Sequence, residues 1–207
     1  MEAEMWDFFR RKTPKSVPLE TQLATLASCG ISLVPGITID ALTMSFDRDN
    51  FEADPYRLAL TVMGTEAETE AQAGPGGYPS DNIWHFDTEC IEDHGDYARI
   101  ASRLRALAQG DLPLQQIEDH VDVEAGEAWL AFQLGGQSHL WEAKVEDDWV
   151  DTNVLSRFAG LLVKQGRSRR FTYIDLGGGQ DCLIGCSTPD QRSALRERTG
   201  LKVEWLD

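Results

Sequence analysis

The residue types best suited to chemistry lie in one short run, residues 84–90. Alternate side chains of a β-strand project to the same face, so this run would present an imidazole and two carboxylates together. The residues concerned are His85, Asp87 and Glu89, with Asp93 and His94 close behind. Such a set could bind a divalent metal, and a metal-dependent hydrolase is therefore one alternative. The run has no recognised zinc spacing, and alternation alone predicts a polar outer strand face. We favour that simpler interpretation and expect no metal and no cofactor.

A second acidic run, Glu146–Asp148 with Asp151, has oxygen ligands suited to calcium or magnesium. It lacks the glycine and the alternating oxygen ligands of an EF-hand loop. Acids just ahead of predicted helices, such as Asp93, Asp96, Asp148 and Asp151, are better explained as caps of the free N–H groups. Trp149 lies inside this run and is a candidate interface anchor.

Two further patterns have structural explanations. The run Gly177–Gln180 lacks the lysine and the following helix of a phosphate loop, so it predicts a turn between two strands. Cys182 and Cys186 would lie about 13 Å apart on the second of these strands, which is too far for a disulfide. We expect buried, reduced thiols there.

The charge of the chain is large and unevenly distributed. The 207 residues include 19 Lys and Arg against 35 Asp and Glu, a net charge of −16. Residues 65–96 hold nine acids and no Lys or Arg, and residues 111–151 hold eleven acids and one Lys. Neutralising nucleic-acid phosphates or binding an anionic membrane needs basic surfaces, so we predict neither partner. A concentrated negative potential can instead steer a basic protein.

The leading functional hypothesis is therefore an acidic interaction module that binds a basic protein. The predicted partner-binding residues are Asp87, Glu89, Glu92, Asp93, Glu146, Asp147, Asp148, Trp149 and Asp151. In general character the chain resembles bacterial immunity proteins that neutralise cationic toxins, a resemblance of composition rather than of particular residues. That resemblance implies an inhibitor, and we favour binding over catalysis. A regulatory or assembly subunit is the third alternative.

Hydrophobic periodicity predicts one α+β domain. We expect a helical segment over 1–46, a flexible loop over 65–80 and a sheet-and-helix body over 57–207. Within the body we expect a mainly antiparallel sheet built from successive strand-strand-helix units, with the helices largely on one face. The elements expected there are strands at 57–63, 82–88, 128–134, 137–143, 171–176, 181–186 and 201–205, and helices at 96–109, 152–165 and 189–199. No apolar stretch is long enough to span a bilayer, and we expect a cytoplasmic protein.

Overall fold

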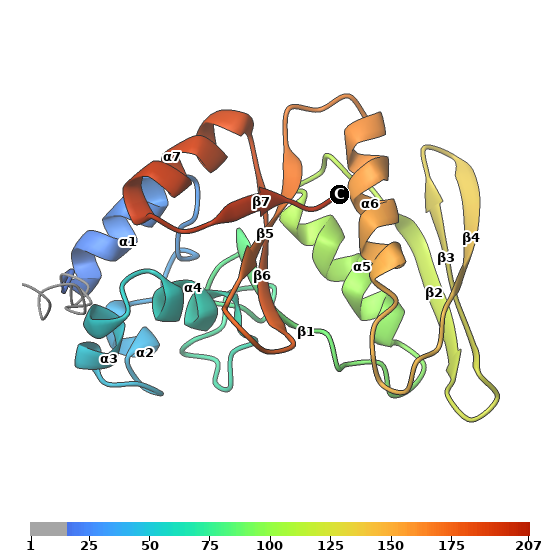
Figure 1. Ribbon diagram of the computed structural model, residues 1–207, viewed down its shortest axis with the longest axis horizontal. Coiled ribbons are helices and arrows are strands. Elements are labelled where there is room, and N and C mark those ends of the chain that lie inside the picture. The colour runs from blue at the N-terminus through green and yellow to red at the C-terminus, as the bar shows by residue number, and fades with distance from the viewer. Residues whose placement is uncertain (1–15) are drawn as a thin grey trace, which may run out of the picture.

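The structure, a computed structural model, describes residues 16–207, so the helical character predicted for 1–15 lies outside the described part. Two antiparallel sheets are present (Figure 1). The larger sheet has the order β1 (Ile83–Asp87), β6 (Asp181–Ser187), β5 (Arg170–Asp175) and β7 (Val203–Trp205). The smaller sheet has the order β2 (Gln115–Asp122), β3 (Glu127–Leu134) and β4 (Gln137–Ala143). The helices are α1 (Leu19–Ser28), α2 (Ile39–Leu42), α3 (Arg48–Ala53), α4 (Arg57–Gly64), α5 (Asp96–Leu107), α6 (Thr152–Lys164) and α7 (Pro189–Thr199). The α+β class is confirmed.

Helices cover both faces of the larger sheet (Figure 1). Strand alternation shows this on β6, where Cys182 and Ile184 belong to one hydrophobic cluster and Leu183 to the other. The first cluster contains α5, α6 and the inner face of the smaller sheet, and the second contains α1, α3, α4 and α7. The helices are therefore not gathered on one face as expected. They form layers on either side of the larger sheet, and the smaller sheet lies beyond α5 and α6.

The predicted strand at 57–63 is wrong, because these residues form helix α4. Its apolar residues occur so densely that they satisfy a period of two and a helical period equally well. The buried residues have the spacing of one helix face: Ala59, Leu60 and Met63 are each at most 1% exposed. At the end of the helix, a Cβ on Gly64 would lie 2.6 Å from the backbone nitrogen of His85. Glycine therefore permits a close approach of α4 to β1.

Strand β2 is the second departure from the expected order. Its sequence is mostly polar, and Ile117 and Val121 are its only aliphatic residues. They are four positions apart, so the alternation that marks a half-buried strand is interrupted. A register shift between Gln115 and Glu118 accompanies this irregular pattern. The regular succession of strand-strand-helix units is not confirmed.

The strands predicted at 128–134 and 137–143 form the β3–β4 hairpin. Leu134 pairs with Gln137, Phe132 with His139 and Leu130 with Trp141. Phe132 packs against Phe158 of α6, with ring centroids 5.4 Å apart. This contact joins the smaller sheet to the helix layer.

The segment 65–80 consists of turns, and its last residues are buried. Tyr78 is 9% exposed and Ser80 is 0% exposed. Within residues 16–207, no helix is both long enough and apolar enough to cross a membrane.

Candidate functional site: an acidic surface around Trp149

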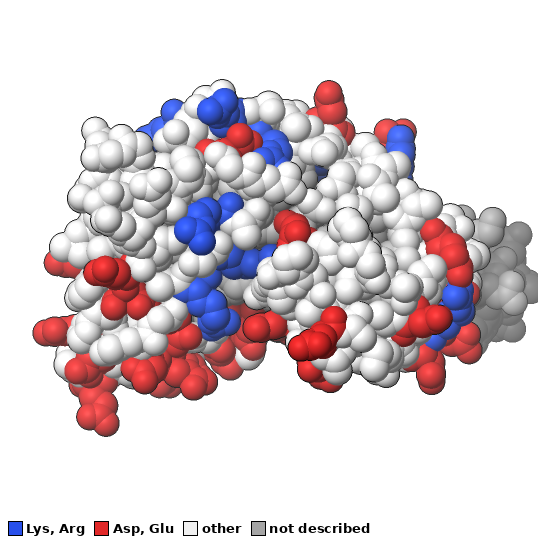
Figure 2. All heavy atoms as spheres, turned by 180° about the vertical axis from the view of Figure 1, so that it is seen from behind, with Lys and Arg blue, Asp and Glu red and all other residues white. Residues whose placement is uncertain are grey.

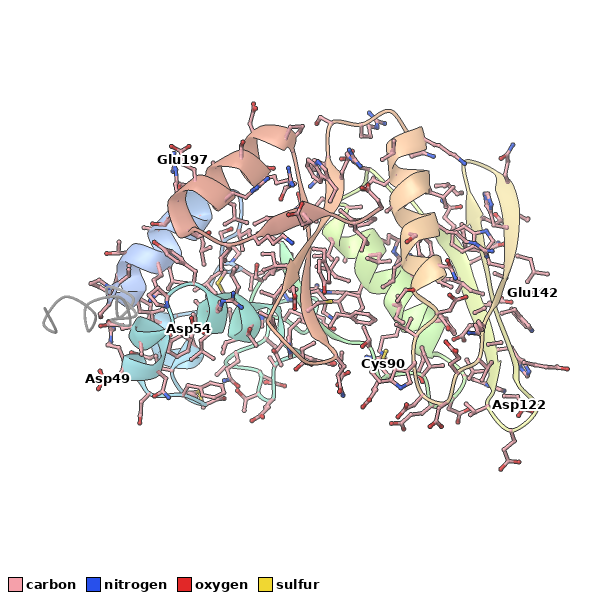
Figure 3. All side chains as sticks on the ribbon, viewed as in Figure 1. Asp49, Asp54, Cys90, Asp122, Glu142 and Glu197 are labelled. Carbon is pink, nitrogen blue, oxygen red and sulfur yellow. The ribbon has the colours of Figure 1, made fainter. Side chains whose placement is uncertain are left out.

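The two acidic segments, distant in sequence, are hydrogen-bonded side by side. The backbone N–H groups of Cys90 and Ile91 donate to the carbonyl oxygen of Asp148, at 2.8 and 2.9 Å. In return, the N–H of Val150 donates to the carbonyl oxygen of Thr88 at 2.8 Å. These bonds bring the end of β1 and the loop before α6 into one surface. Figure 3 shows Cys90 beside the lower ends of α5 and α6.

Tyr97 and Asp151 connect this surface to the helices beneath it. The buried hydroxyl of Tyr97 accepts a hydrogen bond from the N–H of Asp151 at 3.0 Å. The Asp151 carboxylate caps α6 by accepting from the N–H of Asn153, and it also accepts from the N–H of Lys144. Burial acts against ionisation, but the hydrogen bonds from Lys144 and Asn153 outweigh it and lower the pKa of Asp151. Asp151 is therefore a structural cap as well as a surface acid.

Helix α5 is capped from a distant strand. Gly95 precedes the helix with φ of 102°, a conformation that glycine adopts without strain. The Asp119 carboxylate accepts from the N–H groups of Gly95, Tyr97 and Ala98, at 2.8, 2.9 and 3.2 Å. Asp96 instead accepts from the N–H groups of the turn before it. The sequence favoured Asp93 and Asp96 as caps, and it gives no sign of Asp119, 24 positions from Gly95.

The carboxylates of the surface differ in exposure and in partners. Glu92, Asp93, Glu146 and Asp147 are exposed, whereas Asp87, Glu89 and Asp148 are half-buried. Glu146 pairs with Lys144. The other six carboxylates have no Lys or Arg nitrogen of residues 16–207 within 4 Å. They are Asp87, Glu89, Glu92, Asp93, Asp147 and Asp148. We call these acids, together with Glu146 and Trp149, the Trp149 surface.

Trp149 stands at the edge of a hollow in this surface. Its side chain is 43% exposed, which is unusual for a residue of its size. It lines a cavity of about 340 Å³ whose walls include Leu155, Tyr173 and Leu206. Asp181 and Gln180 lie at the same cavity, and the Gln180 amide donates to the Glu89 carboxylate at 2.7 Å. The arrangement offers an aromatic, apolar recess bordered by carboxylates.

The structure separates the residues of the metal-site alternative. His85 lies 3.6 Å from Asp181 through its Nε2 atom, and Glu89 bonds to Gln180. His94 faces β2 instead, where its Nδ1 accepts from the N–H of Val121. Among the residues that the structure describes, no three His, Cys, Asp or Glu side chains are arranged to hold a metal ion.

The cysteines are poorly suited to nucleophilic chemistry. All four are free thiols. Burial raises the pKa of Cys90 to about 11 and the pKa of both Cys182 and Cys186 to about 12. Because the thiolate is the nucleophile, these raised pKa values disfavour a nucleophilic role at neutral pH.

Comparison with known proteins finds no family model that matches the chain, and no similar curated protein or solved structure. The interpretation of the Trp149 surface therefore rests on its geometry.

Proposed function

We propose that the chain is a binding module for a basic protein and that the Trp149 surface is its contact face. The observation that carries the proposal is the main-chain pairing of residues 88–91 with 148–150, which places acids from both segments around an exposed tryptophan. Like charges brought together in this way repel each other, and a cationic partner would relieve that repulsion. Tryptophan beside a recess is a typical energetic centre of a protein interface.

The most concrete form of this function is inhibition of a cationic bacterial toxin. An inhibitor of a cationic toxin must bind a basic surface, for which an acidic face with one aromatic anchor is suited. In this role the protein would act in the cytoplasm, where its thiols stay reduced. A regulatory or assembly subunit would use the same exposed anchor, but it would not require the excess of acids around it.

The decisive experiment compares two triple variants with the same change in net charge. The first neutralises exposed acids of the Trp149 surface: Glu92→Gln, Glu146→Gln and Asp147→Asn. The second neutralises exposed acids that Figure 3 shows near α1, α3 and α7, at the opposite end of the molecule: Asp49→Asn, Asp54→Asn and Glu197→Gln. Binding is measured by calorimetry against a basic protein purified by affinity capture on the parent protein.

We expect the first variant to lose at least tenfold more affinity than the second, with a weaker dependence on salt. Equal losses in the two variants would mean that net charge, and not this surface, governs binding. The substitution Trp149→Ala is expected to weaken the affinity for the partner without changing its dependence on salt, because the substitution removes apolar contact area and no charge.

A further inference from the structure

A separate cavity of about 290 Å³ lies between α5 and the loop that precedes β1. Its charged and polar lining consists of Glu66, Tyr78, Asp81, Arg99, Ser102 and Arg103. It adjoins a smaller hollow of about 130 Å³, which shares Glu66, Tyr78 and Arg99 with it. This cavity does not include Trp149 or any acid of the Trp149 surface.

Arg103 is the unusual member of this lining, because a guanidinium is buried there without a carboxylate partner. The residue is 5% exposed. Its Nη2 donates to the carbonyl oxygens of Ser80 and Ile83, at 3.0 and 2.7 Å, and its guanidinium carbon lies 3.5 Å from the centre of the Tyr78 ring. Its Nε is buried and has no hydrogen-bond partner. Burying an unpartnered polar group is costly, so this arginine is held in place at the expense of stability.

The cavity is lined by equal numbers of acidic and basic side chains, and these are not paired with one another. Within residues 16–207, neither Glu66 nor Asp81 lies within 4 Å of Arg99 or Arg103. Arg99 does form an ion pair, at 3.2 Å, but with Asp96, which does not line the cavity. Arg99 and Arg103 are one helical turn apart, a spacing at which like charges repel.

Two basic and two acidic side chains therefore line one hollow, and none of the four is paired with another of them. Burial lowers the pKa of Arg103, and the charges of Asp81 and Glu66 counteract part of this effect. On the face that Figure 2 shows, several Lys and Arg gather in one group near the centre, and acids lie along the lower edge.

We propose that this cavity binds a small zwitterion of the amino-acid type, with its carboxylate at Arg99 and Arg103 and its ammonium at Glu66 and Asp81. A simple anion such as acetate fits less well, because Glu66 and Asp81 repel it. A simple cation such as methylammonium is repelled by the two arginines. Only a ligand that carries both charges satisfies both walls, and guanidinium–carboxylate pairing is strong and directional.

The test is calorimetric titration of the purified full-length protein with the standard L-amino acids, β-alanine and 4-aminobutyrate. Acetate, phosphate and methylammonium serve as single-charge probes. We expect at least one amino acid to bind tenfold or more tightly than any single-charge probe. Binding by none of the amino acids would overturn the proposal, and so would acetate or phosphate binding as tightly as the best amino acid.

Matched variants locate the site. Arg99→Gln and Asp81→Asn are each expected to weaken binding of the best amino acid at least tenfold. Arg105→Gln, on the same helix, and Glu68→Gln, in the same loop, are outside the cavity lining and should bind as the parent does. Equal loss in the lining and control variants would overturn the assignment of the site. Both lining residues are partly exposed, so circular dichroism and thermal unfolding can verify that all four variants are folded.

Discussion

Replacing Tyr97 by Phe removes one hydroxyl from the junction between α5 and the Trp149 surface. The ring is fully buried, so the substitution keeps its packing and deletes only the acceptor for the N–H of Asp151 at 3.0 Å. A typical hydrogen bond contributes about 1 kcal/mol, and a buried donor left without a partner costs about 1–3 kcal/mol. Since Asp151 is only partly buried, we expect the free energy of unfolding to fall by about 1–2 kcal/mol. In a chain of this size, each kcal/mol lowers Tm by about 2–4 °C.

Urea unfolding of the parent and the variant measures this loss through the shift of the transition midpoint at constant slope. Tyr173→Phe is the matched control, because its hydroxyl makes no hydrogen bond to the part of the chain that the structure describes, and its loss should stay below about 0.5 kcal/mol. Amide hydrogen exchange at Asp151 should become faster in the Tyr97 variant only. If the two variants lost the same stability, the hydroxyl would not hold the acidic segment.

Three further predictions concern the structure that supports the surface. Asp119→Ala removes the carboxylate that accepts three N–H groups at the start of α5, so unfolding free energy should fall by about 2–4 kcal/mol in urea; a loss below about 1 kcal/mol would contradict this cap. The hydrogen bond from Arg48 lowers the pKa of Glu20 from 4.5 to about 2. The stability that this ion pair adds to the fold is complete above the ordinary pKa and is lost as pH falls towards 2, so Glu20→Gln should make the urea midpoint less sensitive to pH in that range. An unchanged sensitivity would contradict the prediction. Cys182 and Cys186, whose pKa values burial raises to about 12, should resist iodoacetamide at pH 7.5 in the native protein and react after unfolding. Peptide mass spectrometry measures this, and rapid alkylation of the native protein would contradict the burial of the two thiols.

The parts of the fold that the sequence predicts well are those set by local chemistry. Gly135 and Gly136 adopt positive φ angles of 60° and 79° at the turn of the β3–β4 hairpin, and a two-residue turn fixes the register of both strands. Thr188 and Gln191 form a capping box at the start of the helix predicted over 189–199, with Pro189 at the first helical position. In these places the neighbouring residues alone determine the backbone.

The parts that the sequence predicts poorly depend on distant contacts. Residues 57–63 are apolar enough to suit a strand or a helix, and packing against β1 selects the helix. Strand β2 is mainly polar, and its pairing with β3 places it in the sheet. Asp119 caps α5 only because β2 lies beside the start of that helix. Charge clustering in the sequence identifies the acids of the Trp149 surface, and position ahead of a helix identifies Asp151 as a cap of α6, but neither gives any sign of the role of Asp119.

The construction of the Trp149 surface bears on why its acids are there. Main-chain hydrogen bonds and the neutral Tyr97 hydroxyl bring the acidic segments together, and among residues 16–207 only Glu146 of these acids pairs with a lysine. Carboxylates brought close without cations lower the stability of the folded chain through repulsion. Solubility alone would be served as well by acids spread evenly over the molecule. Groups that destabilise a fold persist where binding requires them, and here they surround an exposed tryptophan at a recess. This stability cost therefore favours a basic partner over solubility as the reason for the cluster.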